Sequence, residues 1–168
     1  MTHERRQALL AYLQSHLIVP QPRPFAEKLC GSMPQRAART EARADAASLA
    51  ERVGHLDESF TEMLLRKIDE KGMTDAQCYK KANVDRKLFS KIRSDAHYRP
   101  SKQTAVAFAI ALELPPNEAD ELLSKAGFAL SRSSKFDVII SYFIENRVYD
   151  LAEINEALYE FDQPLLCV

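Results

Sequence analysis

Apolar residues recur at helical spacing along most of the chain. Over residues 5–17 they form one helical stripe, with members at i, i+3, i+4 and i+8: Leu9, Tyr12, Leu13 and Leu17. Prolines at positions 20, 22 and 24 follow, and they predict a stiff extended linker. An Ala- and Arg-rich run over 35–55 then predicts a further helix. We expect residues 1–57 to form an N-terminal helical arm that docks on the rest of the chain, pairs with a second copy (dimerisation), or binds a partner.

Helix-start and helix-stop signals become sharper after residue 57. Two sequences fit the capping box, in which a hydroxyl and a Glu or Gln side chain each bond the other residue's backbone N–H: Ser59 with Glu62, and Thr74 with Gln77. Gly72 lies between the two boxes and is a typical helix terminator. The sequence therefore predicts one helix that ends at Gly72 and a short second helix over 75–82.

A tight turn is expected directly after the second helix. Asn83 tolerates the left-handed backbone conformation, and Asp85 is a suitable N-cap for a third helix over 85–94. In that helix Phe89 and Ile92 are three residues apart, so both face inward. Two short helices joined by such a turn have the geometry of a helix-turn-helix.

Two more helices complete a compact domain over 58–130. The fourth helix is expected to follow a Ser101 cap, to carry apolar residues on one face, and to end at the two prolines 115 and 116. For the fifth helix, Asn117 with Asp120 predicts the start and Gly127 the end.

The last segment, 131–168, has the pattern of an acidic helical hairpin. Ser134 with Asp137 predicts the start of its first helix, and Asp150 with Glu153 the start of its second. Both helices carry apolar stripes that must be covered, so we expect the C-terminal hairpin to pack on the fifth helix. The apolar tail 164–168 is then either tucked in or offered to a partner.

Composition favours an all-α fold. Of the 168 residues, 46% are hydrophobic and 28% charged, which is ordinary globular composition. The chain has only 4 glycines and few alternating segments, so the signals of a turn-rich sheet protein are missing.

Residues 73–127 resemble the λ-repressor-like (Cro/XRE-type) helix-turn-helix family. The resemblance is carried by Met73-Thr74, the turn Asn83-Val84-Asp85, Phe89 and Ile92, Pro100-Ser101, and Leu112-Glu113-Leu114. It implies a five-helix DNA-binding domain with additional flanking helices, whose recognition helix 85–94 enters the major groove. On that helix the resemblance places the base contacts on Arg86, Lys87, Ser90 and Lys91. It places the phosphate contacts on Lys80, Lys81, Arg93, Tyr98, Arg99 and Lys102.

Charge is concentrated in the same part of the chain. The net charge is −1, but residues 80–102 carry eight basic and two acidic side chains, a local +6, whereas 135–168 carry −5. A concentrated basic stretch on a helix-turn-helix frame favours binding to a polyanion. The leading hypothesis is a DNA-binding transcriptional regulator, a repressor or similar, that binds double-stranded DNA as a homodimer.

One alternative is a non-enzymatic adaptor with a helix-turn-helix-like fold, which binds protein partners through the N-terminal arm or the C-terminal hairpin. It is favoured by Asp75, whose carboxylate would repel a phosphate, and by the acidic last segment. RNA binding lacks a stacking platform, since Phe89, Phe108 and Phe128 lie at core positions.

No catalytic motif is evident, so we expect no enzyme activity, no cofactor and no metal. The four histidines are scattered without ligand spacing, and Cys78 is expected to be a small core residue. Three widely spaced cysteines suggest a reducing compartment. The start of the chain lacks a signal-peptide pattern, and no stretch approaches the ~18 apolar residues of a membrane span. We therefore expect a cytoplasmic protein without membrane contact.

Overall fold

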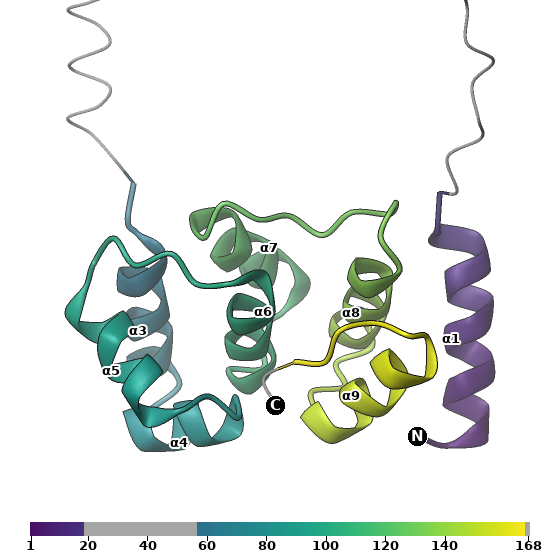
Figure 1. Ribbon diagram of the computed structural model, residues 1–168, viewed down its shortest axis with the longest axis horizontal. Coiled ribbons are helices and arrows are strands. Elements are labelled where there is room, and N and C mark those ends of the chain that lie inside the picture. Colours follow the sequence, from purple (N-terminus) through teal and green to yellow (C-terminus); the bar gives the residue numbers. More distant parts are fainter. Residues whose placement is uncertain (19–56, 167–168) are drawn as a thin grey trace, which may run out of the picture. The chain divides into compact units, whose positions relative to one another are not determined.

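A computed structural model describes residues 1–18 and 57–166, and within these ranges every regular element is an α-helix. The helices are α1 (His3–His16), α3 (Phe60–Glu70), α4 (Asp75–Lys81), α5 (Arg86–Ser94), α6 (Lys102–Ala111), α7 (Pro116–Lys125), α8 (Lys135–Glu145) and α9 (Leu151–Glu160). The prediction of an all-α chain is confirmed for this part. The expected proline linker and the helix over 35–55 lie outside it. Of the described residues, 1–18 and 58–166 belong to one compact unit, shown in Figure 1.

Most helix starts follow the local capping signals. Both capping boxes form, with Ser59 Oγ accepting from Glu62 N and Thr74 Oγ1 accepting from Gln77 N. Asp85, Ser101, Ser134 and Asp150 cap the helices that follow them. These starts are as predicted, because an N-cap depends only on residues two or three positions away.

The predicted start of α7 is wrong. The sequence places an N-cap at Asn117, but the helix begins at Pro116, and Pro115 stands at the cap position without a side-chain hydrogen bond. Proline suits the first helical position, because its φ is already helical and its missing N–H would have no intrahelical partner. The second proline therefore opens α7. The expectation that the two prolines end α6 is also wrong, because α6 ends at Ala111 and the left-handed Glu113 already turns the chain before Pro115.

Six of the helices end in the same way, with a left-handed residue whose successor bonds back to the helix. Gly72 and Gly127 fill that position after α3 and α7, as expected, and Asn83 fills it after α4 with φ 52°. After α6, α8 and α9 the left-handed residues are Glu113, Arg147 and Asp162. Glu113 and Arg147 carry no sequence signal, because their side chains have no preference for positive φ, whereas Asp162 is of a residue type that tolerates it.

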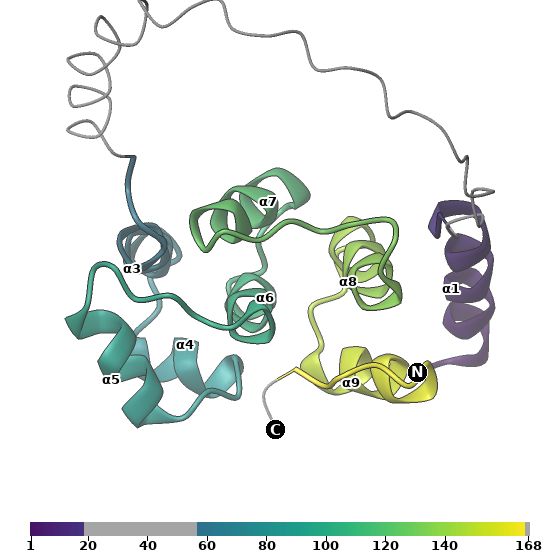
Figure 2. The same ribbon diagram turned by 45° about the horizontal axis from the view of Figure 1, so that its top comes forward.

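α6 is the central helix of the unit (Figure 2). It contacts α4, α7 and α9, and every residue from Thr104 to Ala111 is buried. The sequence assigned only one apolar face to this helix. Because neighbours cover it on several sides, α6 is instead apolar all round, as buried helices are.

Phenyl rings of α3 and α5 pack near a phenyl ring of α6. The centre of the Phe108 ring of α6 lies 6.5 Å from the centre of the Phe60 ring of α3 and 5.9 Å from that of the Phe89 ring of α5. The Tyr79 ring of α4 lies 5.7 Å from Phe89. These contacts anchor α5 through the Phe89 ring, which packs against rings of both α4 and α6.

α8 and α9 form the expected hairpin and lie on the other side of α6. α8 contacts α7, and α9 contacts α6. The tail is tucked in as far as Leu166, which is fully buried and exchanges two hydrogen bonds with the side chain of Asn155.

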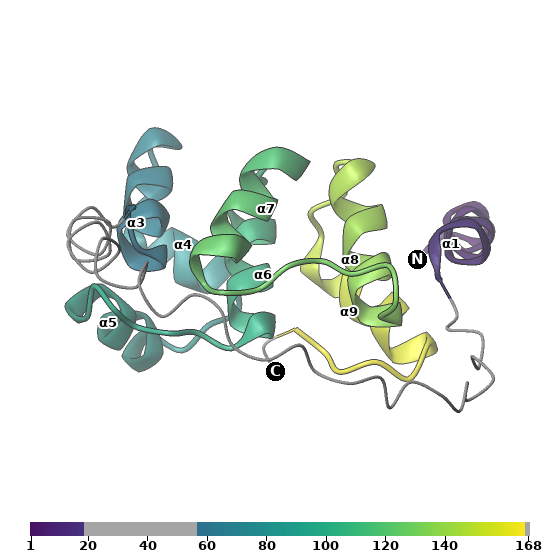
Figure 3. The same ribbon diagram turned by 90° about the horizontal axis from the view of Figure 1, so that it is seen from above.

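The N-terminal helix α1 packs on this hairpin, which was one of the three alternatives for the arm. Leu9 and Leu13 are buried, the Tyr12 ring meets Tyr142 of α8 at 5.2 Å, and Ile18 N donates to the Arg132 carbonyl at 2.8 Å. α1 and α5 lie at opposite ends of the row of helices in this unit, which is clearest from above (Figure 3).

Candidate nucleic-acid interface

α5 is held by its inner face and exposes the rest. Asp85 Oδ2 accepts from Lys87 N at 2.9 Å and caps the first turn, while Phe89 is 3% exposed and Ile92 fully buried. The four residues predicted to contact bases, Arg86, Lys87, Ser90 and Lys91, are all exposed. The outer face of α5 is therefore free of the flanking helices.

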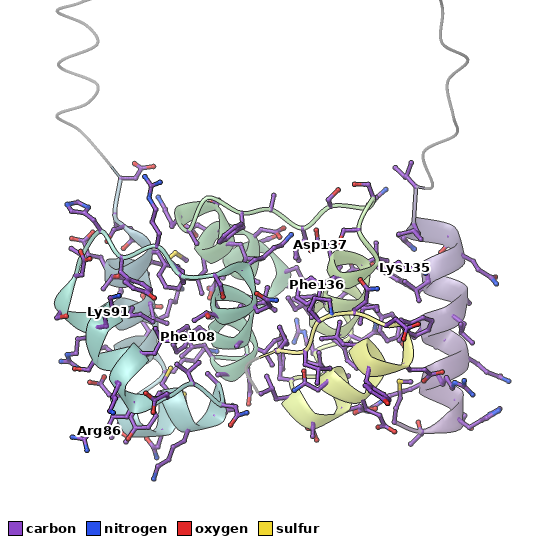
Figure 4. All side chains as sticks on the ribbon, in the orientation of Figure 1. Arg86, Lys91, Phe108, Lys135, Phe136 and Asp137 are labelled. Carbon is purple, nitrogen blue, oxygen red and sulfur yellow. The ribbon has the colours of Figure 1, made fainter. Side chains whose placement is uncertain are left out.

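The basic side chains among these four form no ion pair with any residue in 1–18 or 57–166. Lys91 Nζ lies 5.5 Å from the centre of the Tyr98 ring, a cation–π contact that leaves its charge in place. Arg86 projects from the first turn of α5, at the lower left of Figure 4. We call this surface, Arg86, Lys87, Ser90 and Lys91, the outer face of α5.

The six predicted phosphate contacts divide into two groups. Lys80 and Arg99 are exposed and make no ion pair within the described ranges, and Tyr98 is half-buried under Lys91. The other three are paired with carboxylates. Lys81 Nζ lies 2.5 Å from Glu113 Oε1, Arg93 pairs with Asp75, and Lys102 Nζ lies 2.6 Å from Asp137 Oδ1. Sequence reasoning identified the cations but missed these partners.

Lys102 differs from the others because it is tied to the interior. Its ammonium bridges the carboxylate of Asp137, which is 3% exposed, and the Ala129 carbonyl at 2.9 Å. Figure 4 shows Asp137 at the start of α8, next to Lys135 and Phe136. Lys102 thus links α6 to α8 and to the connection before α8, and this position suits it to stabilising the fold.

Three carboxylates of the last segment, Glu145, Glu153 and Glu160, face α1. Arg5 pairs with Glu153 at 2.5 Å, Arg6 pairs with Glu160, and Tyr12 Oη donates to Glu145 at 2.8 Å. Burial and this hydrogen bond raise the pKa of the Tyr12 hydroxyl. The acidic hairpin is therefore partly neutralised by the N-terminal helix and does not cancel the charge of α5.

An open groove of about 450 Å³ runs between α4 and α5. It is lined by Asp75, Ala76, Tyr79, Arg86, Phe89, Ser90 and Arg93. The groove therefore contains two guanidinium groups and two hydroxyl groups beside one carboxylate, a mixture that suits an anionic group if the carboxylate moves aside.

We also searched the described residues for a metal site, a membrane-spanning helix and a reactive thiol. No cluster of three or more His, Cys, Asp or Glu side chains could hold a metal there, and no helix is long and apolar enough to cross a membrane. Cys78 is fully buried, as predicted, and burial raises the pKa of its thiol to about 12. The thiol stays protonated near neutral pH, so it does not supply a thiolate nucleophile.

Comparison of the chain with protein-family models, with curated proteins and with solved structures finds no match.

Proposed function

We propose that residues 58–130 form a λ-repressor-like helix-turn-helix domain and that the chain is a DNA-binding transcriptional regulator without enzyme activity. In this proposal α4 and α5 are the two helices of the motif and α5 enters the major groove of double-stranded DNA. Arg86 and Lys87, in the first turn, donate to base edges, with Arg86 able to bind guanine through two hydrogen bonds.

The observation that carries the proposal is the exposed outer face of α5 with unpaired cations. α5 has nine residues, buries Phe89 and Ile92, and leaves Arg86, Lys87 and Lys91 in solvent. Such a helix is suited to a groove lined by phosphates and acceptor atoms. Lys80 and Arg99 flank this face and would hold phosphates on either side.

The proposal includes a homodimer. One recognition helix of this length contacts only a few base pairs, so a second copy is needed for useful specificity. Two α5 helices about 34 Å apart would match successive major grooves on one side of the duplex.

The test is a mobility-shift assay at fixed salt with the double variant Arg86→Ala/Lys87→Ala. We expect it to lose the preference for a selected duplex over a scrambled one while its circular dichroism stays unchanged. The matched control is Arg132→Ala/Lys135→Ala, which removes the same charge from exposed positions outside α5. Unaltered preference in the α5 variant would reject the assignment of base contacts.

A protein-binding adaptor is the second candidate, and the three ion pairs at Lys81, Arg93 and Lys102 favour it. Each of them lowers the positive charge available to phosphates. In this case the chain would retain no duplex DNA at low salt and would co-purify with a protein partner that depends on the N-terminal arm or the C-terminal hairpin.

A further inference from the structure

The ion pair between Asp75 and Arg93 spans the groove between α4 and α5. Asp75 is the first residue of α4, and Arg93 lies in the last turn of α5. Both side chains remain accessible to solvent, at 37% for Asp75 and 56% for Arg93. The pair is therefore open to competition by any anion that enters the groove.

The surroundings of this pair suit a phosphate group. Tyr79 and Ser90 line the same groove, so two hydroxyl groups accompany the Asp75 and Arg93 pair, while Arg86, which also lines it, donates to the base edges in the proposed function. Arg93 and Arg86 both lie on α5, the helix that would face the DNA. A phosphodiester and a carboxylate offer Arg the same planar pair of acceptor oxygens, so one can replace the other.

Exchange of the carboxylate is energetically accessible. An exposed ion pair of this kind is weak, because water screens it and two side chains must be held in one geometry. A phosphate within a duplex also attracts cations more strongly than an isolated anion does, because the adjacent phosphates add to the negative potential.

We propose that Asp75 is an internal competitor for a DNA phosphate: its carboxylate holds Arg93 in the free protein, and a backbone phosphodiester takes its place in the α4–α5 groove on binding. This inference rests on the proposed DNA-binding function and adds a residue that sets the affinity. Because Asp75 stays beside the bound phosphate, the Asp75 and Arg93 pair contributes no net charge to the complex.

Removal of the Asp75 charge gives a measurable signature. Asp75→Asn is expected to tighten binding to a fluorescein-labelled duplex of arbitrary sequence by roughly three- to tenfold near 0.1 M salt. The plot of log Kd against log salt concentration should become steeper by about 0.9, the value for one further neutralised phosphate. Arg93→Gln alone should weaken binding by a similar factor, because it removes the partner of the phosphate and leaves the Asp75 charge beside it without compensation.

The double variant Asp75→Asn/Arg93→Gln tests whether the gain depends on Arg93, and a charge removed far from the groove tests for a general charge effect. It should lose both the gain in affinity and the steeper slope, because Arg93 is the group that Asp75 releases. The matched control is Asp162→Asn on the α9 side, which removes the same charge at an exposed position where φ is 54° and Asn is equally tolerated. It should leave the slope unchanged.

The outcomes distinguish this inference from the proposed function. If the wild-type chain binds DNA and Asp75→Asn has the same Kd and the same salt slope, the competitor role alone is overturned. The same holds if the gain in affinity of Asp75→Asn persists when Arg93→Gln is added. If neither the wild-type chain nor Asp75→Asn binds duplex DNA even at low salt, the proposed function fails and the competitor role fails with it.

Discussion

Replacement of Lys102 by Ala tests whether this lysine stabilises the fold rather than binding a phosphate. The Lys102 ammonium lies 2.6 Å from Oδ1 and 2.7 Å from Oδ2 of Asp137. Oδ2 also accepts from Ser131 N at 3.0 Å, whereas Oδ1 is buried and has no hydrogen-bond partner other than the Lys102 ammonium within the described residues. Lys102→Ala therefore leaves a buried carboxylate without its counter-charge and one of its oxygens without any partner.

The cost follows from the burial of the two groups. Breaking a fully buried ion pair by removal of one partner costs about 3–5 kcal/mol. Asp137 is 3% exposed but Lys102 is 27% exposed, so water can reach part of the site. We expect a loss of about 2–3 kcal/mol in the free energy of unfolding, a large share of the usual total for a domain.

Urea denaturation followed by circular dichroism measures this loss. The midpoint of Lys102→Ala should fall by about 1–2 M urea relative to wild type. In that background, Asp137→Asn should recover part of the loss, because the amide is neutral and its oxygen still accepts from Ser131. Lys80→Ala, at an exposed and unpaired lysine, should stay within about 0.5 kcal/mol of wild type. A similarly small effect for Lys102→Ala would refute the structural role.

Three further predictions concern local features of the fold. Hydrogen bonds from Ser59 lower the pKa of Glu62 below its ordinary 4.5, so the stabilisation is present above that pH and is lost as pH falls through the lowered value. Glu62→Gln keeps the acceptor and removes the titration, and its acid unfolding profile should be flatter below pH 4.5 than that of wild type. Arg147→Gly should raise the free energy of unfolding by about 0.5–1 kcal/mol in urea titrations, because glycine adopts its φ of 55° without strain; a loss of stability would contradict this. Arg5→Glu/Arg6→Glu should speed amide hydrogen exchange in α1 and leave α3–α7 unchanged, since both arginines pair with α9, and equal exchange would show that apolar contacts alone hold α1.

Local signals predicted the helices well, because caps depend on residues close in sequence. Ser59, Thr74, Asp85 and Ser134 each cap the helix that the pattern assigned to them. The α7 start was misplaced because Asn117 and Pro116 are both good helix-start residues, and only the backbone path decides between them.

Contacts between distant residues could not be predicted in the same way. Asp137 lies 35 positions after Lys102, and its sequence pattern indicated only a capping residue. The pairing of Asp75 with Arg93 requires the crossing of α4 and α5 to be known. The exposure of the outer face of α5, in contrast, follows from the spacing of Phe89 and Ile92.

Binding of duplex DNA to the outer face of α5 can be located residue by residue. Amide chemical-shift perturbations of the full chain, titrated with a short duplex at about 50 mM salt, locate the interface directly, since phosphate contacts are strong at low ionic strength. We expect the largest shifts over residues 86–94 and at Lys80 and Arg99, with α1, α8 and α9 unaffected. Shifts confined to α1, α8 and α9, or none at any duplex concentration, would contradict it.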